Sequence, residues 1–355
     1  MDQRLQRKDV VADEGATVPR RTRKRASANT ERNCSVARTL DIMSDAWAFL
    51  VIREAFFETR TFEGFRAALD IPRATLTDRL RKLTRQGIFR RVAPTKDARR
   101  KEYRLTKAGF DLYPSFIALM QFGDHWLAGG KKPPLTLIHN SCGCENHPIV
   151  ACSACLEEAK PREVTYRDGP GAGRTQTRVG RNPRRSSDDS KFLVGRPSSV
   201  SRALQVIGDK WSFMVAREAF FGVRRYDQIQ ANLNIAPNIL TDRLSRFVAK
   251  GIFRKRIYQK SPPRYEYVLT DKGRDLYGPF IAMLAWGDRW LSDGRPPLIL
   301  THKECGKDFH PLVICDRCRA PINAAAMSYK LNYNAKAYGA SGPRDVRTHT
   351  PKIVR

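Results

Sequence analysis

Histidine and cysteine residues recur at metal-ligand spacing in two places along the chain. The pattern H-x2-C-x9-C-x2-C spans residues 139–155 and occurs again over residues 302–318. Thiolates and imidazole are donors that tetrahedral zinc prefers, and four protein ligands leave no open coordination position. The patterns therefore predict two structural zinc ions per chain, with ordinary buried thiols as the alternative. The predicted ligands are His139, Cys142, Cys152 and Cys155, followed by His302, Cys305, Cys315 and Cys318.

Two other histidines compete for the fourth ligand position of each set. His147 and His310 each stand in a His-Pro dipeptide between the cysteine pairs, so either they or His139 and His302 complete the sets. Cys144 has no matching cysteine in the second pattern and is left out. Seven of the eight cysteines lie in these patterns, which favours a reducing, cytoplasmic location over a disulfide framework.

The two cysteine patterns belong to a long internal repeat. Residues 41–91 align without gaps on residues 205–255, with 22 identities in 51 positions. The blocks W-x-F-x-V-x-REAFF, LTDRL and GIFR occur once in each copy. This period is far too long for a solenoid, so the sequence indicates a duplicated domain.

Length and charge agree with two domains and a polyanionic partner. The 355 residues exceed what one hydrophobic core usually holds. Lys and Arg number 65 against 36 Asp and Glu, and the hydrophobic fraction of 41% excludes a wholly disordered basic protein. The net charge of +29 predicts phosphate neutralisation on a nucleic acid, with an anionic membrane surface as a minor alternative. No apolar run approaches the ~20 residues of a bilayer span, so no membrane insertion is expected.

Each copy has the pattern of a small helical domain that ends in a hairpin. A helix is expected over residues 72–86 of the first copy, where Leu76, Leu80 and Leu83 form a buried stripe and Gly87 ends the helix. Two strands joined by a polar turn follow, and a long amphipathic helix completes the unit. This order predicts a winged helix-turn-helix fold, α+β and mainly helical, in both copies. A generic α+β domain with solvated arginines is the alternative.

Together these blocks resemble HxlR-type transcriptional regulators. The resemblance rests on W-x-F-x-V-x-REAFF, on the LTDRL helix and on the L-T-x-x-G segment before the long helix, in both copies. It covers most of residues 34–170 and 196–320 and implies a bacterial winged-helix DNA-binding regulator, usually a dimer of single-domain chains. Because this chain carries two such units, it pairs either internally, as a pseudo-dimer, or with a second chain. The absence of a Gly-rich phosphate loop, a nucleophile–base pair and an open metal site argues against an enzyme.

Composition shifts divide the chain into seven segments. The predicted segments are a basic flexible tail over 1–33, winged helix-turn-helix domains over 34–130 and 196–294, zinc-ribbon-like Cys/His extensions over 131–168 and 295–322, a flexible linker over 169–195 and a polar tail over 323–355.

The predicted function is sequence-specific binding of double-stranded DNA for transcription regulation, and nonspecific nucleoid or RNA binding is the alternative. Helices over about 72–86 and 237–250 would enter the major groove, with basic wings on the backbone. Asp78 and Asp242 are expected to pair with basic residues four positions later, and Arg79 and Arg243 to contact phosphates. The predicted DNA contacts are Arg73, Thr75, Thr77, Arg79, Arg81, Lys82, Arg99, Arg100, Asn238, Thr241, Arg243, Ser245, Arg246, Arg256 and Arg264.

Two further features are candidates for regulation. Cys34 precedes the first helix, where the second copy has Ser198, and the resemblance makes it a candidate redox sensor. An ordinary thiol is the simpler interpretation. Aromatic residues of the long helices, such as Phe122 and Trp286, are candidates to line a pocket for a small-molecule effector, although such residues more often form a core or a dimer interface.

Overall fold

The first copy folds as four helices, a hairpin and two further helices. The computed structural model describes residues 30–43, 45–93, 101–176 and 195–334. The Asp45 side chain caps α2 by accepting a hydrogen bond from the Ala48 N–H, and Gly87, with φ of 73°, follows the end of α4. The elements are α1 (Ser35–Met43), α2 (Ala46–Phe56), α3 (Phe62–Leu69), α4 (Arg73–Arg85), β2 (Phe89–Val92), β3 (Glu102–Leu105), α5 (Lys107–Phe110) and α6 (Tyr113–Leu127).

The second copy repeats this order with the same local signals. Asp209 caps α8 as Asp45 caps α2, and Gly251, with φ of 69°, follows α10. The elements are α7 (Ser199–Ile207), α8 (Lys210–Phe220), α9 (Tyr226–Leu233), α10 (Pro237–Ala249), β8 (Phe253–Gln259), β9 (Arg264–Leu269), α11 (Asp271–Asp275) and α12 (Tyr277–Leu291). The predicted α+β, mainly helical class with two helix-turn-helix units is confirmed.

The leucine stripe of α4 is buried as the sequence predicts. Leu76, Leu80 and Leu83 are each at most 1% exposed, and α4 packs against α2. The rings of Phe65 and Phe89 meet edge to face with centroids 6.2 Å apart, so the hairpin is tied to the helices. The opposite face of α4 is therefore the one turned to solvent.

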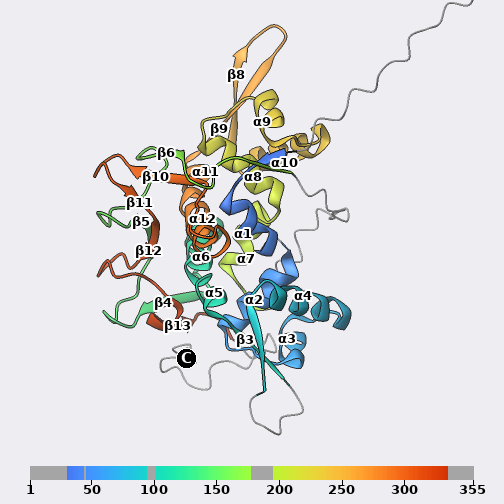
Figure 1. Cartoon of the computed structure of the whole chain (residues 1–355), viewed down its shortest axis with the longest axis vertical. Helices are drawn as coiled ribbons and strands as arrows, with labels where there is room; N and C mark the ends of the chain where they lie inside the picture. The colour runs from blue at the N-terminus through green and yellow to red at the C-terminus, as the bar shows by residue number, and fades with distance from the viewer. Residues whose placement is uncertain (1–29, 44, 94–100, 177–194, 335–355) are drawn as a thin grey trace, which may run out of the picture.

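Strands that follow the long helices pair between the two copies. They are β4 (Leu135–His139), β5 (Ile149–Cys152) and β6 (Val164–Asp168) in the first copy, and β10 (Leu298–His302), β11 (Asp308–Phe309), β12 (Pro311–Ile314) and β13 (Met327–Leu331) in the second. β4 pairs with β13, β5 with β12 and β6 with β10, all antiparallel. Figure 1 shows these extension strands gathered on one side of the molecule. The two extensions thus form one shared structure.

Parts of the predicted tails and linker belong to this fold. β13 lies inside the predicted polar tail 323–355 and occupies in the second copy the place that β6 has in the first. β1 (Thr30–Arg32), from the predicted tail 1–33, pairs with β7 (Arg174–Gln176), from the predicted linker 169–195. These predictions were wrong at those strands, because pairing with a distant strand satisfies a backbone that has no apolar periodicity of its own. The remainder of these three segments lies largely outside the described residues.

Helices of the two copies meet at the centre of the molecule. α1 packs against α12, α6 packs against α7, and α6 also contacts α12 (Figure 1). A Cβ on Gly123 would lie 2.1 Å from the Ser199 backbone O, and one on Gly287 would lie 2.5 Å from the Ser35 backbone O. Only glycine permits such an approach. The two copies therefore pack as an internal pseudo-dimer, with one hairpin at each end of the long axis.

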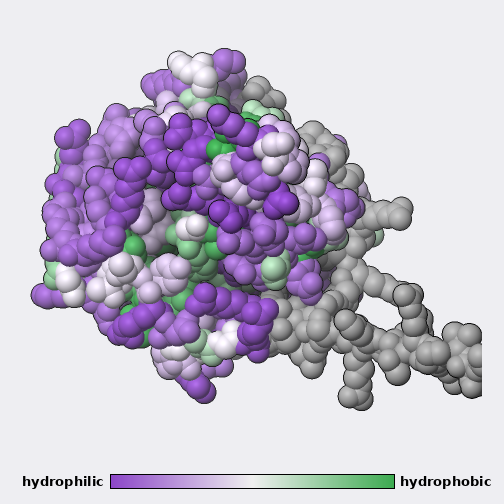
Figure 2. All heavy atoms as spheres, turned by 90° about the horizontal axis from the view of Figure 1, so that it is seen from above, coloured by the Kyte–Doolittle hydropathy of each residue, from purple (hydrophilic) through white to green (hydrophobic). Residues whose placement is uncertain are grey.

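The outer surface matches the high charge of the chain. Seen from above, it is mostly hydrophilic, and hydrophobic residues gather toward the middle of this face (Figure 2). No helix of the described residues has both the length and the apolar character of a membrane span.

Candidate nucleic-acid interface and metal centres

The solvent-facing side of α4 carries exposed arginines. Arg73, Thr77 and Arg81 are exposed at successive turns of the helix. The Arg73 guanidinium lies 3.3 Å from a Glu63 carboxylate oxygen and 5.4 Å from the centroid of the Phe62 ring, which orients the side chain. Exposed guanidinium groups can bind guanine through two hydrogen bonds. This face is therefore equipped to contact base edges.

The matching side of α10 is polar but carries shorter side chains. Asn238, Thr241 and Ser245 are exposed there, and Ser245 stands where α4 has an arginine. The Tyr226 hydroxyl on α9 lies 2.9 Å from the Pro237 backbone O and 3.1 Å from Thr241 Oγ1. This contact fixes the start of α10 against α9. α4 and α10 are thus equivalent helices of the two copies, but they expose different polar side chains.

Arg79 and Arg243 occupy structural positions. Arg79 Nε donates to Asp45 Oδ1 at 2.7 Å, and Arg243 Nε lies 3.0 Å from Asp209 Oδ2. Their side chains are only 25% and 16% exposed. Arg79 therefore ties α4 to the capped start of α2, and Arg243 ties α10 to the capped start of α8, a role that the sequence-based prediction of phosphate contacts did not include.

Three other predicted contact residues are half-buried. They are Thr75, Lys82 and Arg246. Lys82 Nζ donates to the Asp41 backbone O at 3.2 Å. Asp78 forms an ion pair with its neighbour Arg79, whereas its expected partner Lys82 bonds to the Asp41 backbone. In the second copy Asp242 forms an ion pair with its neighbour Arg243.

The β8–β9 hairpin, which is the wing of the second copy, combines positive charge with exposed apolar side chains. Arg264 is exposed on β9, and Arg256 on β8 pairs with Glu266. The sequence analysis missed Ile257, Tyr258 and Tyr265, which are 48%, 38% and 44% exposed on the same hairpin. Their signal was the presence of apolar and aromatic residues among charged ones, in FRKRIYQ of β8 and RYEYVL of β9. In the first wing, the predicted contacts Arg99 and Arg100 lie outside the described residues.

The eight predicted metal ligands form two clusters, and each cluster takes residues from both copies. Donor atoms within each cluster all lie within 4.8 Å of one another. One cluster consists of His139, Cys142, Cys315 and Cys318, and the other of Cys152, Cys155, His302 and Cys305. The expected grouping of four ligands within one copy is therefore wrong. The ligands are shared because β5 of the first copy pairs with β12 of the second. Cys152 ends β5 and Cys315 follows β12, and in this antiparallel pair the two cysteines belong to different clusters.

The donor sets have the dimensions of a tetrahedral zinc site. Cys318 Sγ lies 3.2 Å from His139 Nδ1, and Cys142 Sγ lies 3.9 Å from Cys315 Sγ. Zinc with sulfur at about 2.3 Å and nitrogen at about 2.0 Å would place neighbouring ligands roughly 3.5–3.8 Å apart. In the other cluster, a hydrogen bond from the Lys307 backbone lowers the pKa of Cys305 to about 7, which favours its thiolate form, whereas burial raises the pKa of Cys155 to about 11.

The competing ligands lie outside both clusters. Among the described residues, His147 and His310 use their backbone N–H groups to bind Asp316 and Ser153 of the other copy, and their rings join neither donor set. Cys144 is exposed and is also outside the sets.

The family of the chain follows from a comparison with known proteins. Residues 42–131 and 206–295 both match the family model described as HxlR-like helix-turn-helix. The chain belongs to the HxlR-like helix-turn-helix family. The two matched segments contain α4 with its hairpin and α10 with its hairpin, so both helix-turn-helix units belong to HxlR-like segments.

Relatives of this HxlR-like chain match a stretch about as long as one of its two copies. A protein of Mycobacterium tuberculosis named "Uncharacterized HTH-type transcriptional regulator" is 44% identical over 137 residues, which are 39% of this chain and 87% of the relative. A Synechocystis protein of the same description is 36% identical over 104 residues, 29% of this chain and 77% of the relative. Membership in this family supports a DNA-binding transcription regulator.

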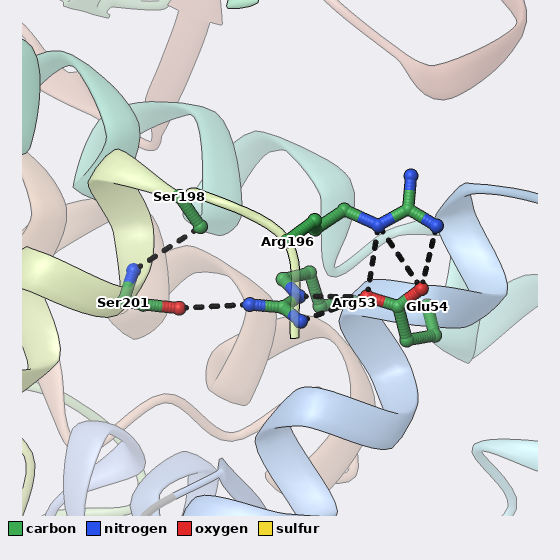
Figure 3. A network of polar contacts seen from close by, with 5 residues as sticks. All are labelled: Arg53, Glu54, Arg196, Ser198 and Ser201. Atoms are coloured by element: carbon green, nitrogen blue, oxygen red, sulfur yellow. Dashed lines mark hydrogen bonds and ion pairs between the residues drawn. The ribbon is translucent and has the colours of Figure 1, made fainter. Parts of the chain in front are cut away.

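A buried ion network holds the start of the second HxlR-like copy against the first. Arg196 inserts beside α2, where its Nη2 donates to Glu54 Oε2 at 2.8 Å, and Arg53 Nη2 donates to Glu54 Oε1 at 2.8 Å (Figure 3). Arg53 Nη1 reaches Ser201 Oγ at 3.0 Å, and Ser198 caps the same helix, α7. The Glu54 side chain is fully buried. Sequence reasoning used the Arg-Glu dipeptide only as a family motif and missed this role.

Cys34, the candidate redox sensor, lies at the related place in the other half. Its side chain is 5% exposed and lies beside Arg217, which donates to Glu218 Oε1 at 2.7 Å. Burial separates this thiol from oxidants in solution. Its arrangement fits a packing role beside the ion pair.

Proposed function

We propose that this HxlR-like chain regulates transcription by binding one double-stranded DNA operator with both of its winged helix-turn-helix units. In each unit the second helix of the motif, α4 or α10, would enter the major groove, and the adjoining hairpin would lie along the backbone. The observation that carries the proposal is the packing of the two units as an internal pseudo-dimer, with α4 and α10 on the side away from the extension strands (Figure 1). The net charge of +29 supports extensive phosphate contact.

The operator would contain two related but unequal half-sites. Exposed Arg81 on α4 can bind guanine, whereas the equivalent residue of α10 is Ser245. Exposed Asn238 on α10 can bind adenine, whereas α4 has Ala74 there. Thr77 and Thr241 are shared, so the half-sites keep a common element. Arg79 and Arg243 would support the helices from behind.

We also propose that zinc fills both Cys/His clusters in a structural role. Each cluster offers three thiolates and one imidazole nitrogen, and a fourfold protein donor set leaves no position for substrate. Bound zinc would join strands of both copies and so hold the extensions, at residues 131–168 and from 295 onward, in their exchanged arrangement. This proposal fits the predicted boundaries of the two winged helix-turn-helix domains, 34–130 and 196–294.

Selection of bound sequences from a random duplex pool tests the proposal. The wild-type chain should enrich two unequal half-sites about one helical turn apart, roughly 34 Å. Arg81→Ala should relax base preference in one half-site, and Asn238→Ala in the other, each at a cost of about 1–3 kcal/mol. Each variant is the matched control for the other. No enrichment would mean nonspecific nucleic-acid binding, and a perfect palindrome equally sensitive to both changes would mean pairing between two chains.

A further inference from the structure

Two cavities related by the internal repeat lie beside the long helices. The first is lined by α6, by residues 147–150 and 158–161 of its extension, and by the segment 274–279 of the other copy. The second is lined by α12, by residues 310–313 and 321–323, and by the segment 110–114 of the other copy. Most lining residues of one cavity have their repeat partner in the other. Each cavity thus lies where a long helix, its extension and the opposite copy meet.

The two cavities differ in size. The first has a volume of about 260 Å³ and the second about 590 Å³. Small-molecule sites usually occupy roughly 300–1,000 Å³, so only the second falls in that range. Shorter side chains explain the difference, because Ala285, Pro321 and Asn323 stand where the first copy has Gln121, Glu158 and Lys160.

The larger cavity has a mostly apolar lining that includes two carboxyl groups, those of Asp111 and Asp288. Trp286 lies in its wall with the indole N–H held by the Ala108 backbone O at 2.9 Å, which fixes the ring. Asp111 Oδ2 accepts from Trp290 Nε1 at 3.2 Å and lies 3.3 Å from Arg289. Asp288 contributes a second carboxyl group to the lining. Aliphatic and proline side chains make up most of the rest.

From this lining we infer that the larger cavity binds a flat, largely apolar aromatic molecule that carries one hydrogen-bond-donating group, such as an aromatic amine. The ring would lie against Trp286, and the donor would face the Asp111 carboxylate. The inference extends the proposed function by adding a small-molecule effector to the regulator. Asp111 directly follows α5, which is joined to wing strand β3, so an occupant contacts the segment that leads from the first wing.

Fluorescence titration of the full chain with N-phenyl-1-naphthylamine tests this site. This probe is a neutral aromatic amine with one N–H, and its emission rises in apolar surroundings. Saturable binding of one probe per chain is expected. Ala285→Trp fills the cavity and should weaken binding at least tenfold, whereas Gln121→Trp, the same change at the related position, should leave it unchanged. Equal binding by both variants, or no saturation by the wild type, would overturn the inference.

Two further measurements keep the result interpretable. Ala285→Gln introduces the residue that the first copy has at the equivalent position, Gln121, so the fold should tolerate it. This variant should weaken probe binding and leave the circular dichroism spectrum unaltered. 1-Phenylnaphthalene, which lacks the N–H, should compete about fivefold less well than the amine, consistent with one hydrogen bond; equal competition would remove the acceptor role of Asp111. Because these titrations contain no DNA, they report on the cavity even if the operator proposal fails.

Discussion

Pairs of cysteine substitutions distinguish the exchanged metal clusters from clusters confined to one copy. Cys142 and Cys315 belong to the same cluster, with sulfurs 3.9 Å apart, although they come from different copies. Cys142 and Cys152 come from the same copy but belong to different clusters. The double variant Cys142→Ser/Cys315→Ser therefore leaves one complete cluster. The double variant Cys142→Ser/Cys152→Ser leaves two clusters with three donors each.

Zinc content under chelator competition measures the difference. Structural zinc sites bind with about 10–16 kcal/mol when all four donors are present, and loss of a thiolate weakens them enough for a strong chelator to compete. In the presence of 4-(2-pyridylazo)resorcinol, we expect two zinc ions in the wild type, one in Cys142→Ser/Cys315→Ser and none in Cys142→Ser/Cys152→Ser. The reverse order for the two variants would refute the exchange, and a wild type without zinc would refute the metal assignment.

Two further predictions concern buried carboxyl groups between the copies. Glu54→Gln should destabilise the chain by about 3–5 kcal/mol in urea unfolding, because two buried guanidinium groups, those of Arg53 and Arg196, lose their counter-ion. The control Glu218→Gln should cost less, because the Glu218 carboxylate accepts from Arg217 and Asn232. Equal losses of stability would argue against the role of Arg196. Asp288→Asn should stabilise the chain by about 1–2 kcal/mol at pH 8 but not near pH 4. Burial raises the pKa of Asp288 from 3.8 to about 6, so between these pH values the unfolded chain loses the proton while the folded chain still holds it. The destabilisation by Asp288 therefore develops between about pH 4 and pH 6 and is complete above pH 6, and a variant effect that is the same at pH 4 and pH 8 would contradict this.

The features that depend on local pattern could be predicted from the sequence. Leu76, Leu80 and Leu83 recur at helical spacing, and their burial follows from that spacing alone. Gly87 ends α4 because the position needs a positive φ. The repeat made each signal appear twice, so the order of elements and the family followed. All eight clustered metal ligands were also identifiable from their spacing.

The features that depend on contacts between the copies could not be predicted. Both copies have the same ligand spacing, so the sequence is equally compatible with clusters inside a copy and clusters shared between copies. β13 has no strong alternation and forms because β4 of the other copy is available to pair with it. Arg79 resembles any exposed arginine of a recognition helix until Asp45, 34 positions earlier, is brought beside it. Distant partners decide each of these cases.

The stoichiometry of the DNA complex shows whether both helix-turn-helix units of one chain bind the same operator. If the two reading units of one chain bind one operator, native mass spectrometry of the chain with its selected duplex should show one chain per duplex. The complex should remain at that ratio when the chain is in modest excess, because both half-sites are already filled. Two chains on a duplex that carries a single pair of half-sites would contradict the account, since each chain would then contribute only one of its units.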